Sequence, residues 1–394
     1  MRILFLTTQL PYPPQSGGLI KSWNLVDHWS KKHELLLIHP LKNGDSDYLE
    51  EFKTKVTLKE HFYVPLDRSR TPFNLLRSYL KHASLNVYRN FHQSIKEKVQ
   101  ALSTSVDIIF LDHYELGQYI PGSYMGKVVL HEHNAEFIMW KRLAELEKNP
   151  IKKLLLNIES GRILKAEKTY AGRADLVLAA PNDIDELCSQ GVDRKKMRKT
   201  YHLGEDFMLD AAPMQFEKTK KSLLYIGTLT WEANVDGLIW FIDNCWTELR
   251  SRNPDLILSI VGKNPDERII QLAEDNEGIE LRGFVRDLED CYPIHRVFIV
   301  PLRFGSGIKV KILNALYRGI PTVTTAIGTE GLETIDGKHL FECTGAEDFI
   351  DKVDVLLKDK ELWRSMSDAS RELSRKYTWK SLLAEHDSQL ESLI

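Results

Sequence analysis

The chain has 394 residues, of which 43% are hydrophobic and 28% are charged, and its formal net charge is −3. This length is too great for one hydrophobic core and suits two domains, and the composition is that of an ordinary globular protein rather than a fibrous or disordered one. The near-neutral charge gives no indication of a nucleic-acid partner.

The cysteines and the N-terminus both indicate a cytoplasmic protein. The first residues, MRILFLTTQL, have the pattern of a strand and lack the apolar core of a signal peptide. No apolar run approaches the roughly 18 residues that span a bilayer. The four cysteines are far apart and form no C-x-x-C motif, as expected of reduced structural thiols (Cys188, Cys245, Cys291 and Cys343).

Charge is distributed unevenly between the two halves of the chain. Residues 1–205 contain 30 Lys and Arg against 24 Asp and Glu, whereas residues 206–394 contain 23 against 32. Either this asymmetry is chance together with solvated helices, or the first half meets an anionic surface or acceptor.

Apolar strands alternate with helices through the first half. An apolar strand over Arg2–Thr8 is followed by a proline-rich turn that closes at Gly17 and Gly18. A helix over Leu19–Lys31 comes next. Further strands are expected over His33–His39, Asp107–Asp112, Lys127–Leu130, Ala174–Ala179 and Thr200–Leu203, and further helices over 137–172 and Asn182–Gln190. This alternation predicts a doubly wound parallel sheet.

Two stretches of the first half are both basic and apolar. Residues 40–100 are predicted to be irregular, and within 68–98 seven Lys and Arg side chains alternate with apolar ones at helical spacing (Phe73, Leu75, Leu76, Tyr79 and Leu80). The helical stretch 137–172 is also rich in Lys and Arg, with apolar residues over 154–158. Each is either the solvated face of a packed helix or a surface that contacts a membrane or an acceptor.

Polar residues follow two of the expected strands. Asp112 and His113 end one strand, and His131-Glu132-His133 follow the next. Such strand ends carry sites in doubly wound sheets. His131 and His133 alternate onto one face, as metal ligands do, but no third ligand with convincing spacing follows, so we expect no metal. A structural histidine is the alternative for His133.

The second half begins after a polar, patternless stretch, residues 207–221, which is predicted to be an interdomain linker. Strands then end at three glycine-bearing turns, Gly227-Thr228, Gly262-Lys263 and Gly283-Phe284-Val285. The expected elements are strands over Ser222–Ile226, Leu256–Val261 and Ile279–Leu281, and helices over Val235–Arg250, Ala346–Leu357, Lys360–Lys376 and 377–394.

The most informative stretch is Pro301–Gly331, where a strand, a glycine-rich turn, a helix from about Ile308 and another strand succeed one another. Gly305 and Gly307 allow the backbone to approach a ligand closely, and the helix start offers unpaired N–H groups. Lys309 and Lys311 add two charges there. The arrangement suits a diphosphate without a divalent metal to hold it. An ordinary strand-to-helix turn with surface lysines is the plainer alternative.

The run G-S-G-I-K-V-K-I-L-N-A-L-Y-R-G-I-P-T-V in this stretch resembles the nucleotide-sugar signature of GT-B glycosyltransferases of family 4. The resemblance implies an α/β fold with two doubly wound, Rossmann-like domains facing across a cleft. An acceptor-side domain would cover residues 1–206 and a nucleotide-sugar domain residues 222–376. The final helix, 377–394, would cross back to the first domain.

The same resemblance implies retaining transfer of a sugar from a nucleotide diphosphate-sugar to a hydroxyl acceptor. The acceptor would be a saccharide or a lipid-linked glycan in surface polysaccharide or glycoconjugate synthesis. From the positive charge and the basic, apolar-backed stretches of the first half, we expect that half to meet either an anionic membrane, at its inner face, or a lipid-linked acceptor. No dedicated carboxylate nucleophile is visible in the sequence. That fits a mechanism in which the leaving diphosphate accepts the acceptor's proton, with no cofactor or metal.

Individual site residues follow from the family motifs. The H-N-x-E element after Lys127–Leu130 resembles the one that touches the transferred sugar, and G-F-V-R-D-L at 283–288 resembles the loop that cradles the base. The implied catalytic residues are His133, Lys309 and Lys311. The implied acceptor-side residues are Gly17, Gly18, His113 and Glu136. The implied donor-binding residues are Gly227, Thr228, Gly262, Gly283, Phe284, Val285, Gly305, Ser306, Gly307, Ile308 and Asn314.

The sequence departs from the family at two acidic positions. Asn314 stands where a glutamate usually binds the ribose, and Ser306 stands where many members have a second glutamate. The commoner phosphate-binding Arg and Lys of the Gly227 loop are also absent, which shifts that role to Lys309 and Lys311. Two alternatives therefore stay open: a weak or inactive nucleotide-sugar-binding accessory subunit, and a nucleotide-sugar epimerase.

Overall fold

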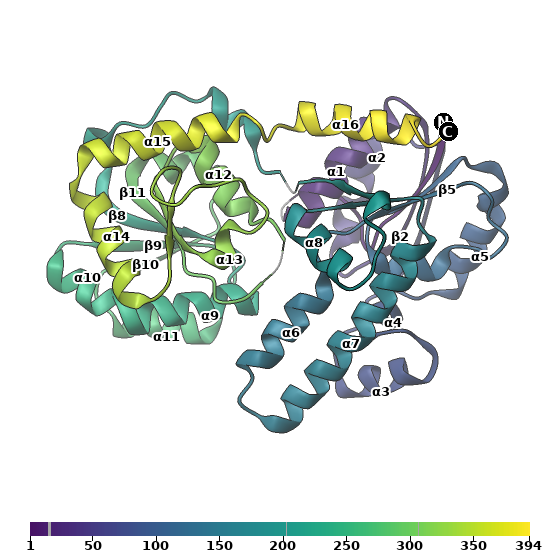
Figure 1. Ribbon diagram of the computed structural model, residues 1–394, viewed down its shortest axis with the longest axis horizontal. Coiled ribbons are helices and arrows are strands. Elements are labelled where there is room, and N and C mark those ends of the chain that lie inside the picture. Colours follow the sequence, from purple (N-terminus) through teal and green to yellow (C-terminus); the bar gives the residue numbers. More distant parts are fainter. Residues whose placement is uncertain (15–16, 202, 306) are drawn as a thin grey trace. The chain divides into compact units, whose positions relative to one another are not determined.

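The computed structural model describes residues 1–14, 17–201, 203–305 and 307–394. These residues form two parallel sheets, of seven and six strands, each covered by helices (Figure 1). Contacts divide the chain into two units, Met1–His202 with Trp379–Ile394, and Leu203–Thr378. The α/β, doubly wound architecture that the sequence predicts is confirmed in both units.

The first sheet has the strand order β3-β2-β1-β4-β5-β6-β7. Successive side chains of β1 alternate between its two faces, so Ile3 and Phe5 join one core while Leu4 and Leu6 join the other. The order reverses between β1 and β4, and ligands bind at such a switch point. The strands are β1 (Arg2–Leu6), β2 (Glu34–Leu41), β3 (Glu60–Pro65), β4 (Ile108–Leu111), β5 (Lys127–His131), β6 (Leu176–Ala179) and β7 (Met197–Lys199).

The helices of the first unit include several that the sequence did not reveal. The interpretation of residues 40–100 as irregular is wrong, because they contain β3 and α2–α5, elements too short or too exposed to show a clear period. The strand expected over Thr200–Leu203 lies at β7 instead, where only Met197 is buried. The helices are α1 (Gly17–Ser30), α2 (Leu49–Lys55), α3 (Pro72–Lys81), α4 (Leu85–Arg89), α5 (Gln93–Leu102), α6 (Glu136–Leu146), α7 (Pro150–Arg173), α8 (Pro181–Ser189) and α16 (Trp379–Glu391).

Polar contacts hold the C-terminal helix α16 against α1 of the first unit. The Asp387 carboxylate accepts hydrogen bonds from His28 Nε2 at 2.9 Å and from Trp29 Nε1 at 3.1 Å, and it pairs with Lys32. Because these three donors lie at the end of α1 and just after it, they hold α16 against that end of the helix.

The second sheet has the strand order β10-β9-β8-β11-β12-β13, with its switch point between β8 and β11. Its strands are β8 (Lys220–Ile226), β9 (Ile257–Val261), β10 (Ile279–Gly283), β11 (His295–Val300), β12 (Thr322–Thr325) and β13 (Phe341–Cys343). Its helices are α9 (Glu232–Phe241), α10 (Thr247–Arg252), α11 (Glu267–Asp275), α12 (Val310–Arg318), α13 (Ala326–Thr329), α14 (Ala346–Lys358) and α15 (Lys360–Ser374).

Residues 207–221, predicted to be a linker, are packed within the second unit. Arg371 on α15 donates hydrogen bonds to the carbonyl oxygens of Leu209 and Ala211, at 2.8 and 2.9 Å. Arg318 on α12 donates to the carbonyl of Ala212 at 2.8 Å. This stretch therefore has fixed partners although its sequence shows no periodicity.

A helix that crosses a bilayer must be both long and apolar. Among the residues that the structure describes, none of the helices combines that length with that apolarity.

Candidate functional site

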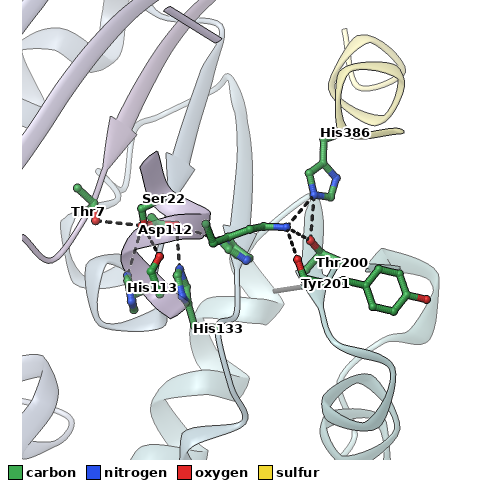
Figure 2. Close-up of polar contacts among 11 residues, drawn as sticks. Thr7, Ser22, Asp112, His113, His133, Thr200, Tyr201 and His386 are labelled. Carbon is green, nitrogen blue, oxygen red and sulfur yellow. Dashed lines mark hydrogen bonds and ion pairs between the residues drawn. The ribbon is translucent and has the colours of Figure 1, made fainter. Parts of the chain in front are cut away.

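A buried carboxylate occupies the switch point of the first sheet. Asp112 follows β4 directly and is fully buried. One of its oxygens accepts from His131 Nδ1 at 3.0 Å and His133 Nε2 at 2.9 Å. The other accepts from Thr7 Oγ1 at 3.0 Å and from the Ser22 hydroxyl (Figure 2). Burial alone would raise the pKa of Asp112, but the charge of His133 and the two histidine hydrogen bonds keep it well below the usual range.

Three of the predicted acceptor-side and catalytic residues meet beside this carboxylate. The rings of His113 and His133 stack with their centroids 3.9 Å apart. A Cβ atom added to Gly18, at the start of α1, would lie 3.5 Å from His133 Nδ1, so the helix start runs close to that ring. Burial and the neighbouring His133 lower the pKa of His113 to about 3, so its imidazole is neutral at physiological pH.

The same cluster meets the distance requirement for a metal site. One ligand atom each from Asp112, His113 and His133 lie within 4.8 Å of one another. However, each oxygen of the Asp112 carboxylate already accepts two hydrogen bonds, so a metal ion would have to displace donors. The arrangement is that of a hydrogen-bond network centred on a carboxylate.

Glu136, which the sequence assigned to the sugar side, lies in a group of buried carboxyl groups. It begins α6, and its backbone N–H donates to Glu167 Oε1 at 2.7 Å. Burial raises the pKa of Glu136, and it raises the pKa values of Glu132 and Glu167 well above the usual range. Burial also raises the pKa of Glu115 to about 7. A raised pKa favours the protonated carboxyl, which both donates and accepts hydrogen bonds.

Lys21, one residue before Ser22 on α1, is fully buried and was not identified from the sequence. Its Nζ donates to Thr200 Oγ1 at 2.6 Å and to the Tyr201 carbonyl at 2.8 Å (Figure 2). Burial lowers its pKa well below the usual range, although Asp112 acts in the opposite direction. Lys21 and the neighbouring Ser22 thus hold the first turns of α1 to two different segments, one at Thr200 and Tyr201 and the other at Asp112. A lysine within the apolar stretch LIKSWNLV was the available signal.

In the second unit, glycines bring the ends of two central strands together. Gly227 directly follows β8, and Gly262 directly follows β9. A Cβ atom on Gly262 would lie 2.2 Å from the Gly227 carbonyl oxygen, and a Cβ atom on Gly227 would lie 2.9 Å from Lys311 Nζ. Side chains at either position would therefore separate the strand ends from Lys311.

Lys311, in the first turn of α12, points at this strand edge. Its Nζ donates to Asn234 Oδ1 at 2.7 Å and to the Tyr225 hydroxyl at 3.0 Å. Asn234 is oriented in turn by its amide, which donates to the Thr228 carbonyl at 2.9 Å. Burial and the nearby Lys309 lower the pKa of Lys311 to about 7. Asn234 and Tyr225 are both neutral, so the amine can accept an anion without first breaking an ion pair.

Lys309 lies differently from its neighbour. It directly precedes α12, is buried, and pairs its Nζ with the Gly307 carbonyl and with Glu330 Oε2 at 3.4 Å. The turn depends on Gly305 and Gly307, whose φ angles of 144° and 70° disfavour other residues. Glu330 was not singled out from the sequence. Ser306 lies outside the described residues, and Ile308 is buried.

Asn314, predicted to face a ribose, has a backbone partner. Its Oδ1 accepts a hydrogen bond from the Glu205 N–H at 2.9 Å. A Cβ atom on Gly204 would lie only 1.7 Å from the same oxygen, so the contact requires glycine there. A role of Asn314 toward a ribose remains a prediction.

The loop predicted to cradle the nucleotide base lies at the same edge of the sheet. The Gly262 N–H donates to the Gly283 carbonyl at 2.9 Å, which places Gly283 beside the end of β9. Phe284, which follows, is 62% exposed, and Lys263 Nζ lies 5.9 Å from its ring centroid. An exposed aromatic ring is suited to stacking against a planar ligand. Val285 completes the loop.

Comparison with known proteins agrees with the architecture. Residues 220–359 match the family described as Glycosyl transferases group 1. A Klebsiella pneumoniae protein described as an uncharacterized 44.6 kDa protein in the cps region is 25% identical over 350 residues, 86% of each chain. A Haemophilus influenzae protein described as an uncharacterized glycosyltransferase is 23% identical over 172 residues, 42% of this chain and 47% of the relative.

Two solved structures extend the comparison to the whole chain. Anabaena Alr3699/HepE, solved in complex with UDP and glucose, has a TM-score of 0.70 at 13% identity and is covered in full, as is this chain. Sucrose-phosphate synthase from Thermosynechococcus elongatus has a TM-score of 0.70 at 14% identity, covering 100% of this chain and 98% of the other. At such identities the likeness establishes the fold. This chain therefore has the GT-B fold, and residues 220–359 of its second unit match the glycosyl transferases group 1 family.

Proposed function

We propose that this protein is a retaining glycosyltransferase that moves a sugar from a nucleotide diphosphate-sugar to a hydroxyl of a saccharide or lipid-linked acceptor. The observation that carries the proposal is the Lys311 amine at the switch point of the second sheet. It lies against Gly227, and its partners are the neutral oxygens of Asn234 and Tyr225. A diphosphate is the ligand that this arrangement suits best.

In the proposed reaction, Lys311 and the start of α12 stabilise the negative charge that develops on the leaving diphosphate. That diphosphate then takes the proton from the acceptor hydroxyl on the same face of the sugar, so the anomeric configuration is retained. Lys309 supports the glycine turn and adds positive potential. No metal is required in this scheme, because two lysines and the helix start supply the charge that a metal would otherwise provide.

The first unit would supply the acceptor side. Asp112 orients His133, which we assign to the transferred sugar, through the 2.9 Å hydrogen bond to Nε2. Gly18 and His113 complete the surface around that ring. Glu136 would offer hydrogen bonds to acceptor hydroxyls.

The relatives suggest the first reagents. Because HepE was solved with UDP and glucose and also with UDP-glucose, uridine diphosphate sugars are the first donors to test. The position of the Klebsiella relative in a cps region supports a role in surface polysaccharide synthesis. We place the protein in the cytoplasm, peripherally bound at the inner face of the membrane.

A thermal-shift screen of nucleotide sugars against the purified full chain tests donor binding. A donor present at about 100 times its dissociation constant should stabilise the protein by about 2.7 kcal/mol. The bound donor is then supplied with candidate acceptors, and the anomeric configuration of the product is read by NMR. If no nucleotide sugar shifts the unfolding temperature, the proposal is wrong.

Two other outcomes identify the alternatives. Donor binding without transfer to any saccharide or lipid-linked acceptor indicates an accessory subunit, a reading prompted by the missing acidic residues at 306 and 314. Isomerisation of the sugar without an acceptor indicates an epimerase.

A further inference from the structure

Helix α3 exposes a continuous apolar stripe. Phe73, Leu76 and Leu80 follow the i, i+3, i+7 spacing of one helix face, and Leu80 is 77% exposed. The opposite side of the helix is the packed one, because Ser78 is fully buried. Apolar side chains at these three positions therefore contribute nothing to the core of the unit.

The first turns of α7 carry a second stripe of the same kind. Ile151, Leu154, Leu155 and Ile158 share one face at i, i+3, i+4, i+7, and all four are exposed, Ile151 by 71%. Leu146, at the end of the preceding α6, is exposed as well. Figure 1 shows that the turn between α6 and α7 extends away from the sheet of the first unit.

The two stripes belong to one surface of the first unit. Arg162 on α7 donates to Ser78 Oγ at 3.0 Å and to the His82 carbonyl at 3.1 Å, which joins α7 to the end of α3. Ile158 and Leu155 precede Arg162 by four and seven residues, so they lie on the same face of α7 as Arg162. We call the two stripes with Leu146 the α3–α7 surface.

The charges around this surface are mostly positive, although Glu145 and Glu147 flank Leu146. The segments 68–81 and 148–158 contain seven Lys and Arg and no Asp or Glu. Arg77 places its guanidinium 4.3 Å from the centroid of the Phe73 ring, and Lys152 and Lys153 are exposed beside the α7 stripe. Soluble monomers rarely leave contiguous apolar surface exposed, and a mostly positive border disfavours partners that are themselves basic.

We propose that the α3–α7 surface docks the protein on an anionic lipid bilayer, with the two apolar stripes inserted among the headgroups and the Lys and Arg residues on lipid phosphates. An amphipathic helix with apolar residues on one face and a basic border lies in the interface in this way. The inference extends the proposed function, because it names the surface and the lipid charge. It does not depend on sugar transfer, since it can be tested without any donor.

The test is flotation of the purified full chain with two kinds of vesicle, phosphatidylcholine alone and phosphatidylcholine containing phosphatidylglycerol. We expect the protein to float with the anionic vesicles at low salt and to float less with them at high salt. Replacing Leu76, Leu80, Ile151 and Leu154 together by Ser should weaken partitioning at least tenfold. The double change Lys152→Glu and Lys153→Glu should do so about tenfold or more.

Matched controls lie elsewhere on the same unit. Met125 is 93% exposed and Lys195 is exposed beyond the other end of α7, so Met125→Ser and Lys195→Glu should float like the wild type. Thermal unfolding of each variant should be unchanged, because every altered side chain is exposed. If the wild type does not float with anionic vesicles, or if the control variants lose binding equally, the proposal is wrong.

A second copy of the chain is the rival occupant of this surface. If the wild type sediments as a dimer and the four-fold Ser variant as a monomer, the surface is a dimer interface, and the lipid proposal is overturned. A wild type that is monomeric in solution and floats only with anionic vesicles supports it. Donor binding by the Ser variant should equal that of the wild type, so failure of docking and failure of the proposed transfer give different results.

Discussion

Asn314 Oδ1 accepts a hydrogen bond from the backbone N–H of Glu205 at 2.9 Å, across 109 residues of sequence. The side chain that replaces the usual glutamate therefore holds the segment that enters the second unit. The fit is close, because Gly204 has no room for a side chain beside that oxygen. An Asn can make this contact where a Glu, one methylene longer, has no space.

Asn314→Ala should lower the free energy of unfolding by about 1–3 kcal/mol, because the partly buried Glu205 N–H loses its partner. Asn314→Glu should also be destabilising, since a buried carboxylate and an extra methylene must be accommodated. Urea unfolding measures both. Asn244→Ala, on the exposed side of the same unit, is the matched control and should change stability little. If Asn314→Ala is as stable as that control but weakens binding of a nucleotide sugar, the side chain acts on the ribose instead.

Lys311→Met should weaken binding of a nucleotide sugar while leaving binding of the free nucleoside nearly unchanged, because the amine faces the proposed diphosphate. A charge-assisted contact of this kind is worth about 1.5–3 kcal/mol. The wild-type affinity should fall as pH rises above about 7, where the free protein's amine loses its proton, and the affinity of Lys311→Met should not. Isothermal titration across this pH range measures both. Lys338→Met, an exposed lysine of the same unit, is the control.

The same lysine makes an independent prediction for stability without ligand. Its pKa lies near 7 in the folded protein against an ordinary value of 10.5, so between these values the unfolded chain binds the extra proton. The free energy of unfolding therefore rises with pH between about 7 and 10.5. Below pH 7 the destabilising effect of Lys311 has its full size. Lys311→Met should be at least as stable as the wild type at neutral pH. A variant that both unfolds more easily and binds less would indicate a purely structural role.

The local parts of this architecture could be predicted from the sequence. Gly305, Gly307 and Lys311 lie within seven residues of one another, and the strand before them is a single apolar run. Their strand–turn–helix arrangement follows from local pattern alone. The continuous apolar run of β1 likewise predicts a strand buried on both faces.

The contacts around Asp112 could not be predicted from local sequence patterns in the same way. The Asp112 carboxylate accepts hydrogen bonds from side chains on or just after three other elements, β1, α1 and β5. These donors are Thr7, Ser22, His131 and His133. Only the parallel sheet brings these segments together, and no spacing in the sequence encodes the pairing. The edge strand β3 was missed for a different reason, since its side chains are mostly half-buried and show no clean alternation.

Arg371→Met should destabilise the second unit by about 3 kcal/mol, because three backbone carbonyls lose a charged donor. Arg371 Nη2 donates hydrogen bonds to the carbonyl oxygens of Leu209 and Ala211, and Nη1 donates one to the Tyr317 carbonyl at 2.9 Å. Trypsin should then cut the wild type slowly and the variant quickly at Lys218, Lys220 and Lys221. Arg375→Met is the control, because its ion pair with Glu372 is on the surface and contributes about 0.5 kcal/mol at most. Equal cleavage of wild type and Arg371→Met would show that residues 207–221 are a mobile connector after all.

His113→Phe should make the first unit more resistant to acid. Burial and His133 hold the pKa of His113 at about 3 against an ordinary 6.5, so below pH 6.5 the unfolded chain binds a proton that the folded protein does not. Stability contributed by the neutral ring is therefore lost as pH falls below 6.5. Phenylalanine keeps a flat ring stacked on His133 and removes this proton. The variant should match the wild type within about 1 kcal/mol at pH 8.

The decisive measurement is the free energy of unfolding of wild type and His113→Phe at a series of pH values below 6.5. The wild-type curve should fall more steeply than that of the variant. A residual slope should remain in the variant, because burial and His133 also lower the pKa of His131 well below its usual range. Asp112 contributes in a lower window, since its depressed pKa removes stability only below the ordinary value of 3.8. Parallel curves for wild type and His113→Phe between pH 6.5 and 3.8 would mean that His113 is protonated as readily in the folded protein as in the unfolded chain. The stacked pair would then be a charged one.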